Sequence, residues 1–274
     1  MLVSHTVLDY AGIEVAEVAC RHRSGRGAET EPSSGYGLVF VRRGCFVRHA
    51  DGAREVLDPT VAFARAPGQE QHYDHPTDAG DDCTALTFDE PTAAALWGAA
   101  PPERPLTVSA RLDFAHRQLL AEGRRGADPD ALYEHAVNLA AATLSQSEPE
   151  PLHAARPSSR RARRRLVHDT REALAEAPAR ALPALARELG VSPHHLSRVF
   201  HAHTGHTIAQ HRLQLRGRAA LERIANGEDS LARLAAELGF ADQSHLTRTI
   251  RQQTGHTPTQ LRTLIHSGSP APGS

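Results

Sequence analysis

The sequence predicts an α+β protein with two domains: an N-terminal antiparallel β barrel with a helical pair, and a C-terminal all-α domain with two helix-turn-helix modules. Three observations carry this prediction: short strands in the first third of the chain, a change of charge near residue 156, and an internal repeat after it. A length of 274 residues is typical of two domains. With 40% hydrophobic and 23% charged residues, the composition is that of a folded chain.

Short strands are predicted from Tyr36 onward. Asp51-Gly52 is a hairpin dipeptide between two apolar segments, and turns containing Pro or Gly separate the other segments. Short strands at regular spacing are typical of a small antiparallel barrel or sandwich. The expected strands are residues 37–41, 45–49, 55–57, 61–63 and 83–88.

Two amphipathic helices are expected after the strands, over residues 112–122 and 131–144. This pair either packs on the barrel or forms a dimer face, and both alternatives stay open. The following stretch, residues 145–159, is rich in Pro and Ser and predicts a linker. Residues 267–274 carry no charge and predict a flexible, low-complexity tail.

The formal net charge of -1 hides two unlike halves. Residues 1–156 hold 14 arginines against 23 acidic residues, whereas residues 157–266 hold 17 arginines against 9 acidic residues. Lysine is absent, so every phosphate contact would fall to a guanidinium group. Such asymmetry is typical of a chain with a nucleic-acid-binding half, although a solvated basic face would give the same composition.

The three cysteines, an odd number at wide spacing, argue against a secreted disulfide framework and favour a reducing compartment. No apolar run reaches the roughly 18 residues of a transmembrane helix. The first residues lack the basic and apolar segments of a signal peptide. We therefore expect a cytoplasmic protein with no membrane partner.

The basic half contains an internal repeat. The segment LARELG at 185–190 recurs as LAAELG at 234–239, and TGHT at 204–207 recurs at 254–257. The offset changes from 49 to 50 residues between these two pairs, so the second turn is one residue longer. Each copy predicts a helix, a tight turn at a glycine and a second helix, which is the pattern of a helix-turn-helix.

Local signals set the boundaries of these helices. Gly190 is expected to end a helix in a left-handed cap, while Ser192-Pro193 and Asp242 are expected to begin the second helix of each copy. A single helix is expected over Ile208–Ala225 to connect the copies. Their second helices would then enter successive major-groove segments about one DNA turn, roughly 34 Å, apart. The expected buried positions are Leu196, Val199, Phe200, Leu246 and Ile250.

From about Arg163 to Arg262, the sequence resembles the DNA-binding domain of the AraC/XylS family of bacterial transcription regulators. The second copy carries the likeness in GFADQSHL at 239–246 and TGHTP at 254–258. Leu246 and Ile250 depart from the aromatic residues usual in the family. The resemblance implies a sequence-specific transcription regulator, activator or repressor, that binds operator DNA and acts with RNA polymerase, with a homodimer as a further implied assembly.

The resemblance also implies which residues contact DNA. Arg198 and Arg248 suit guanine, because a guanidinium pairs with its O6 and N7, and Gln243 suits adenine. The six positions implied to read bases are His194, Ser197, Arg198, Gln243, Ser244 and Arg248. Phosphate contacts, which position a protein without specifying sequence, are expected from Arg212, Arg216, Arg218 and Arg251. The arginine run at 160–165 either adds to them or is a solvated helix face.

An AraC-like chain implies a cupin-like domain that senses a small-molecule effector ahead of the DNA-binding domain. The segment VRRGCFVR at 41–48 and His75-Pro76 carry this weaker likeness. The implied organisation has four parts: residues 1–110 as the cupin-like sensing domain, 111–156 as the helical pair and linker with a dimerisation role, 157–266 as the DNA-binding domain, and 267–274 as the flexible tail.

Thiol and imidazole groups in the N-terminal part raise the question of a metal or redox site, since both are zinc or copper ligands. The residues concerned are Cys20, His22, His72, His75 and Cys83. The His-x-His motif of metal-binding cupins is absent from this part, and Cys83 at a strand start is equally typical of a small core residue. Whether the five residues converge stays open, and we expect no metal and no cofactor.

Two other classes of protein compete with a sequence-specific regulator. A metal-dependent cupin enzyme fused to a DNA-binding domain would need ligand or nucleophile motifs such as Gly-x-Ser-x-Gly, which are absent. A non-specific architectural protein would bind DNA with a steep salt dependence and little sequence preference. We therefore expect a protein that is not an enzyme and has no catalytic residue.

Overall fold

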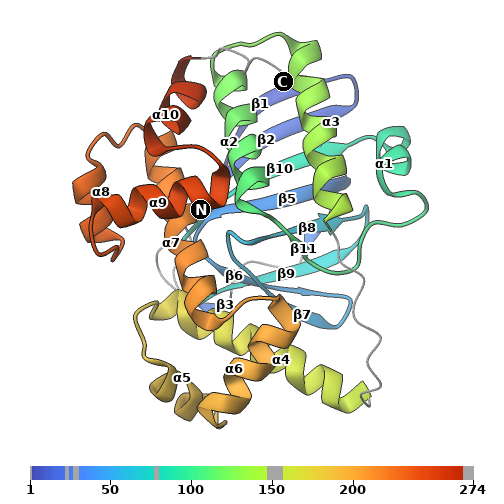
Figure 1. Ribbon diagram of the computed structural model, residues 1–274. Helices are drawn as coiled ribbons and strands as arrows, with labels where there is room; N and C mark the ends of the chain where they lie inside the picture. Colours follow the sequence, from blue (N-terminus) through green and yellow to red (C-terminus); the bar gives the residue numbers. More distant parts are fainter. Residues whose placement is uncertain (1, 22–24, 27–30, 77–79, 147–156, 268–274) are drawn as a thin grey trace.

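The computed structural model describes residues 2–21, 25–26, 31–76, 80–146 and 157–267 (Figure 1). The N-terminal part contains two antiparallel sheets. The larger sheet has the strand order β1 (Leu2–Tyr10), β2 (Ile13–Cys20), β10 (Asp81–Phe88), β5 (Tyr36–Arg43), β8 (Val61–Arg65) and β11 (Leu106–Thr107). The smaller sheet has the order β3 (Gly25–Arg26), β9 (Glu70–His75), β6 (Phe46–Ala50) and β7 (Ala53–Leu57), with β4 (Glu31–Pro32) also paired to β9. Within the described residues the two sheets are separate, so the expected barrel is not closed.

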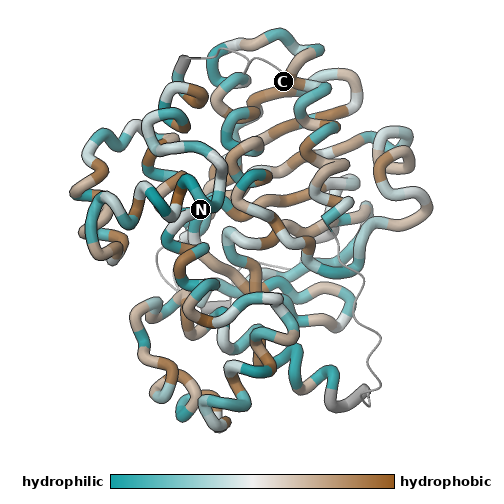
Figure 2. Tube along the Cα trace, viewed as in Figure 1, coloured by the Kyte–Doolittle hydropathy of each residue, from teal (hydrophilic) through white to brown (hydrophobic). Residues whose placement is uncertain are grey.

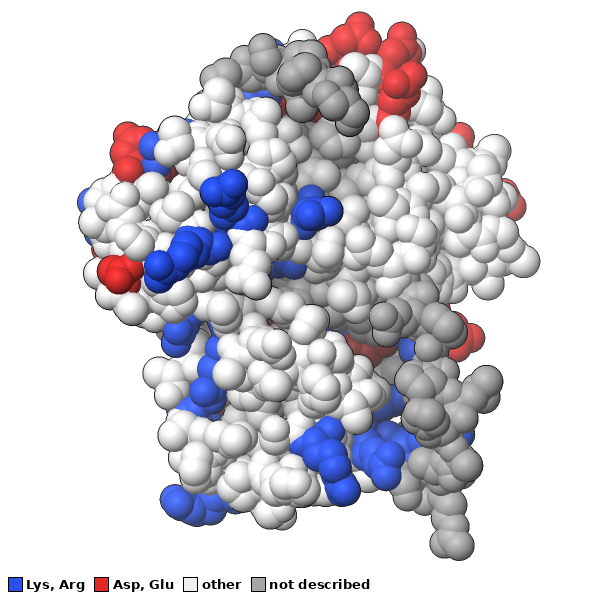
Figure 3. Space-filling view, viewed as in Figure 1, with Lys and Arg blue, Asp and Glu red and all other residues white. Residues whose placement is uncertain are grey.

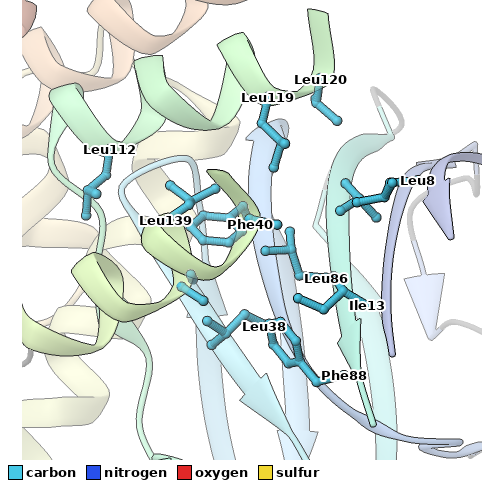
Figure 4. Close-up of a cluster of buried hydrophobic side chains, with 14 of the residues drawn as sticks. Leu8, Ile13, Leu38, Phe40, Leu86, Phe88, Leu112, Leu119, Leu120 and Leu139 are labelled. Atoms are coloured by element: carbon cyan, nitrogen blue, oxygen red, sulfur yellow. The ribbon is translucent and has the colours of Figure 1, made fainter. Parts of the chain in front are cut away.

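Side chains of the larger sheet alternate between two hydrophobic clusters. Along β5, Leu38 and Phe40 join the cluster on one face, while Val39 and Val41 join the cluster on the other. The first cluster packs the sheet against helices, as Figure 4 shows for Leu38, Phe40 and Leu86 opposite Leu119 and Leu139. The second cluster packs the same sheet against the smaller one through Phe46 and Leu57. The period-two alternation of the strands thus builds a helix layer and two sheet layers.

The helix layer consists of α1 (Glu90–Trp97), α2 (Ala110–Arg124) and α3 (Pro129–Ser145). The expected helical pair corresponds to α2 and α3, and both bury apolar side chains on the larger sheet. Of the two alternatives left by the sequence, packing on the sheet is therefore the observed one. Helix α1 was not expected from the sequence, because its eight residues bury only Ala93 and lack an apolar stripe.

The hairpin predicted at Asp51-Gly52 is confirmed. Asp51 and Gly52 have φ values of 51° and 73°, which suits a two-residue turn between β6 and β7. A second hairpin, β1–β2, was missed by the sequence analysis. It turns at Ala11 and Gly12, with φ values of 48° and 80°. Its first strand is exposed along most of its length, so the apolar alternation that betrays a half-buried strand is weak there.

The C-terminal part is entirely helical among the residues that the structure describes. Its helices are α4 (Pro157–Glu176), α5 (Leu182–Glu188), α6 (Pro193–Thr204), α7 (Ile208–Ala225), α8 (Leu231–Glu237), α9 (Gln243–Thr254) and α10 (Pro258–Ser267). They form two hydrophobic clusters, one around α5 and α6 and the other around α8 and α9. Figure 2 shows hydrophobic and hydrophilic residues alternating along these helices, as amphipathic helices require.

The predicted linker and tail coincide only in part with what the structure describes. Helix α3 extends to Ser145 and α4 begins at Pro157, since proline is favoured at the first helical position. The rest of the predicted linker, residues 147–156, lies outside the described residues, as does the tail from residue 268. None of the described helices combines the length and the apolar character that crossing a membrane requires.

The second helix-turn-helix copy packs directly against the N-terminal part, while the first is joined to it through the flanking helices α4 and α7 (Figure 1). Helix α4 contacts β7, and α7 contacts β5. Helix α2 contacts α7, α9 and α10, and its Phe114 and Ala121 belong to the hydrophobic cluster of the second copy. The helical pair thus packs on the sheet with one face of α2 and on the C-terminal part with another.

A buried charge network joins α2 to α7. Arg117 donates through Nε to Asp113 Oδ2 at 3.1 Å, through Nη1 to Glu222, and through Nη2 to the Arg42 carbonyl at 3.3 Å. Arg218 donates to the Val108 carbonyl at 2.6 Å, and its Nη1 lies 3.7 Å from Asp113 Oδ2. Burial alone would raise the pKa of Asp113, but Arg117 and Arg218 hold that pKa well below its usual range.

A second buried contact joins the smaller sheet to α4 and α7. Asp58 accepts hydrogen bonds from the Thr60 backbone and hydroxyl at 2.9 and 2.6 Å. Its other oxygen, Oδ2, lies 3.4 Å from His211 Nε2 and 3.8 Å from Arg171 Nη1. Burial opposes ionisation of Asp58, yet Arg171 and His211 lower its pKa far below the ordinary value. The carboxylate is therefore charged and is shared by three elements.

Replacing Arg117 should strongly destabilise the protein, because it leaves the buried carboxylates of Asp113 and Glu222 without their common partner. We expect Arg117→Ala to lower the free energy of unfolding by about 3–5 kcal/mol. Arg124→Ala, on the same helix, removes a 40% exposed guanidinium paired with Glu17 and should cost about 0–1 kcal/mol. Urea unfolding followed by circular dichroism measures both. Equal, small losses would contradict the role assigned to the network.

His168 predicts a pH-dependent stability. Its Nδ1 accepts a hydrogen bond from the Val56 backbone amide at 3.0 Å, between α4 and β7. Burial, with a further contribution from Arg171, lowers its pKa from 6.5 to about 4. As the pH falls, His168 takes up a proton in the unfolded chain before it does so in the folded chain. The stability that neutral His168 contributes is therefore present above pH 6.5 and is lost as the pH falls toward 4.

His168→Asn tests this prediction, because asparagine keeps an acceptor for the Val56 amide but does not titrate. The free energy of unfolding of the variant should fall less steeply between pH 6.5 and pH 4 than that of the unmodified protein. Urea titrations at several pH values in this window give both slopes. Parallel slopes would show that another group carries the dependence.

Candidate nucleic-acid interface

The two repeats have the same local construction, as the sequence predicted. Gly190 and Gly239 follow the first helices with φ values of 66° and 72°. Ser192 begins α6 by accepting the His195 amide at 3.2 Å, and Asp242 begins α9 by accepting the His245 amide at 2.6 Å. Four residues separate α5 from α6 and five separate α8 from α9, so the longer second turn is confirmed.

The second helices also end in the same way. Each of α6 and α9 has 12 residues and is followed by a glycine in the left-handed region, Gly205 or Gly255. The preceding Thr204 or Thr254 hydroxyl donates to the carbonyl four residues earlier. The repeat seen in the sequence is therefore a repeat of hydrogen bonds, which fixes α6 and α9 as equivalent helices in two modules.

The side chains expected to read bases lie on the outer faces of α6 and α9. Leu196, Val199 and Phe200 are buried beneath α6, and Leu246 and Ile250 are buried beneath α9, as predicted. The outer positions have polar or basic side chains that are exposed, apart from Ser197, which is half-buried: His194, Ser197, Arg198, Gln243, Ser244 and Arg248. Their placement leaves them accessible from outside the helix pair.

Two histidines next to these positions were not proposed as site residues. His195 Nδ1 lies 3.4 Å from Arg198 Nη2. His245 Nδ1 accepts the Ala241 amide at 3.3 Å, and its ring meets that of Phe240 edge to face at 5.4 Å. These contacts make His245 a support of the second turn and place His195 where it orients the Arg198 guanidinium. The helical spacing of three residues was the signal that could have found the His195–Arg198 pair.

The four arginines expected to contact phosphate differ in their surroundings. Arg251 is exposed on α9. Arg212 donates to the Arg180 carbonyl, and Arg216 donates to the Gly239 carbonyl at 2.9 Å, so both are anchored but stay half-exposed. Arg218 is only 3% exposed and lies in the network with Asp113, so the prediction that it contacts phosphate is wrong for this structure. Its place on α7 faces the N-terminal part, which the helical pattern alone did not reveal.

Helix α7 sets the separation of the two modules. Its 18 residues give a length of about 27 Å at 1.5 Å per residue, close to one turn of DNA at roughly 34 Å. Both α6 and α9 contact α7. The modules are therefore held by a single helix whose bounds, Ile208–Ala225, are those predicted.

Arginine side chains spread over the surface of the C-terminal helices (Figure 3). Within the run at 160–165, Arg161, Arg163 and Arg165 are exposed on α4. Arg165 lies 3.7 Å from Asp169 one helical turn later, an exposed pair of little energetic weight. The charge separation seen in the sequence is thus present as a basic surface on the helices.

The proposed metal-ligating residues do not converge as one group. His72 Nε2 contacts Asp74 Oδ1 at 3.0 Å, and the same carboxylate contacts His49 at 2.9 Å. Cys20, His75 and Asp81 instead come together in the interior, and Cys83 donates to Asp81 at 3.5 Å. His22 lies outside the described residues.

Comparison with known proteins agrees with this geometry. Residues 185–263 match the family model described as a helix-turn-helix domain. The chain is 27% identical over 263 residues to the HTH-type transcriptional regulator GlxA of Rhizobium meliloti (strain 1021), covering 94% of this chain and 75% of that protein.

Two solved structures are also similar. Fatty-acid-bound ToxT from Vibrio cholerae strain SCE256 is 10% identical with a TM-score of 0.36, over 94% of this chain and 97% of that one. A DNA-binding transcriptional dual regulator from Escherichia coli K-12 is 22% identical with a TM-score of 0.34, over 37% of this chain and 93% of that one.

The matched family and the paired helices define the class of protein. Residues 185–263 form a helix-turn-helix domain. The match to that domain and the similarity over 94% of the chain to an HTH-type transcriptional regulator indicate a DNA-binding transcriptional regulator.

Proposed function

We propose that this regulator recognises a specific operator by placing α6 and α9 in two successive major-groove segments. The observation that carries the proposal is the equivalence of the two helices: both end and begin alike, and both expose an arginine at the same place, Arg198 and Arg248. A guanidinium at such a position pairs with guanine O6 and N7, and Gln243 pairs with adenine. His194, Ser197 and Ser244 complete the base-reading set.

Phosphate contacts in this proposal come from Arg251, Arg212 and Arg216. Arg251 is free of the protein interior, while the backbone anchors of Arg212 and Arg216 pre-orient their guanidinium groups at the surface. Arg218 takes no part, because it is buried against α2. Contacts of this kind position the protein on DNA and leave the reading of sequence to the bases.

We propose further that a small-molecule signal at the N-terminal domain modulates DNA binding. The support is the interface itself: α7, which carries both modules, contacts β5 and α2 and shares the buried charges of Arg117 and Asp58. A cleft of about 280 Å³ opens beside α7, lined by Glu17, Arg42 and Arg124 of the N-terminal part, by Glu222 of α7 and by Asn226, which follows α7. A polar ligand there would contact both halves at once.

The remaining organisation follows from these roles. Residues 1–110 would be a cupin-like sensing domain whose two facing sheets enclose a core. Within residues 111–156, the side of the helical pair that faces away from the sheet, with exposed Glu134 and Asn138, would supply a homodimer contact. Residues 157–266 would bind DNA in the cytoplasm, and the bound regulator would act on RNA polymerase rather than as an enzyme. The comparison with GlxA, a transcriptional regulator, favours this assignment over a cupin enzyme.

Substituting the two arginines tests the reading of bases. Arg198→Ala and Arg248→Ala should each cost about 1–3 kcal/mol of binding to the selected operator, because each loses a bidentate contact to a base. Operator sequences selected from a random DNA pool provide the ligand, and fluorescence anisotropy gives the dissociation constants. Arg111→Ala, an exposed arginine on α2, is the control and should bind normally. Unchanged binding by both recognition-helix variants would refute the proposal.

Arg251→Ala separates phosphate contacts from base contacts. We expect it to weaken binding to operator and random DNA by similar factors and to reduce the slope of log affinity against log salt by about 1. When the same salt titration is carried out on Arg248→Ala, the loss of affinity should be accompanied by a weaker preference for one base at one position of the operator. A change of sequence preference in Arg251→Ala would show that this residue reads a base instead.

A further inference from the structure

Three side chains of metal-ligating type meet between the two sheets of the N-terminal part. Cys20 ends β2, and Asp81 begins β10 directly opposite Cys20 in the strand register. His75 ends β9 in the other sheet. One ligand atom from each residue lies within 4.8 Å of the other two, and each residue is at most 7% exposed.

The donor set suits a borderline-soft divalent cation. A thiolate, an imidazole and a carboxylate are the three ligand types that zinc uses in proteins. Zinc–ligand bonds of about 2.0–2.3 Å place ligand atoms of a tetrahedral site roughly 3–4 Å apart. His75 Nε2 and Asp81 Oδ2 lie 2.9 Å apart, so small shifts admit an ion. One thiolate and one carboxylate also balance the charge of a divalent cation, which matters because an uncompensated buried charge is costly.

The backbone around Asp81 is packed closely enough to hold this geometry. Gly80 has φ of 64°, and a Cβ there would lie 2.3 Å from the Cys20 carbonyl oxygen. Gly44 has φ of 85°, and a Cβ there would lie 2.4 Å from the Gly80 carbonyl oxygen. Two glycines thus allow the start of β10 to approach the end of β2, which brings Cys20 and Asp81 together.

A neighbouring thiol orients the carboxylate. Cys83 is 5% exposed, and its Sγ donates to Asp81 Oδ1 at 3.5 Å, on the oxygen that does not face His75. Partners of this kind fix the orientation of a ligating carboxylate and raise metal affinity. A His–Asp pair that served only to satisfy buried polar groups would need neither the Cys20 thiol nor the Cys83 thiol beside it.

We propose that Cys20, His75 and Asp81 bind one zinc-class divalent cation, with Cys83 orienting Asp81. The cation joins the larger sheet, through Cys20 and Asp81, to the smaller sheet, through His75. The site lies in the N-terminal part and does not depend on the proposed recognition of DNA.

Cobalt(II) titration of the full-length protein, stripped with a chelator, tests the proposal. One equivalent of Co²⁺ should give the near-ultraviolet absorption of a thiolate–cobalt bond, and Zn²⁺ should abolish that absorption by displacing the ion. Cys20→Ser and His75→Gln should lower the affinity about 100-fold or more, and Cys83→Ala about 10- to 100-fold. Two controls should bind normally: Cys45→Ser, a buried cysteine in a separate cluster, and His72→Gln, which contacts Asp74.

If a buried-site variant fails to fold, the melting temperature of the unmodified protein tests the proposal instead. One equivalent of Zn²⁺ should then raise its melting temperature, whereas the same concentration of Mg²⁺ should not, because Mg²⁺ prefers oxygen ligands. Absence of a stoichiometric thiolate–cobalt band, absence of the zinc-specific rise, or full binding by folded Cys20→Ser and His75→Gln would each overturn the proposal.

Discussion

The buried pairing of charges between α2 and α7 is the constraint on which the arrangement of the two halves depends. Arg117 lies inside the molecule only because Asp113, Glu222 and the Arg42 carbonyl surround its guanidinium. Separating the halves would break the pairing between Arg117 and Glu222. A buried charge that loses its partner lowers the stability of the folded protein strongly. Asp58 imposes the same condition on α4 and α7. The N-terminal part therefore fixes the orientation of α4 and α7.

Helix α7 links this constraint to DNA recognition. One of its faces meets the N-terminal part through Arg218 and Glu222, and its ends hold the two modules in place. A shift of α7 relative to β5 or α2 would move α6 and α9 together, because each packs against α7. Both helix-turn-helix modules are therefore coupled mechanically to the N-terminal part through α7.

Arginine occupies three different structural settings in this chain, which contains no lysine. Buried arginines such as Arg48 and Arg117 neutralise carboxylates and cap carbonyls inside the protein. Half-exposed arginines such as Arg216 and Arg262 tie a helix to the backbone of a neighbouring turn. Arg198 and Arg248 are exposed at the surface of α6 and α9. The planar guanidinium, with five donors and a permanent charge, suits all three settings.

The sequence by itself determined the helix-turn-helix repeat, its caps, the connecting helix and the outward face of each recognition helix, because these depend on hydrogen bonds and apolar spacing within a few residues. It also placed the β6–β7 hairpin through Asp51-Gly52. Only the tertiary structure decided that Arg218 is buried, that two sheets form instead of a closed barrel, and that Cys20 meets His75 and Asp81. These features join residues far apart in the chain, and no local period or spacing encodes which distant elements will pack together.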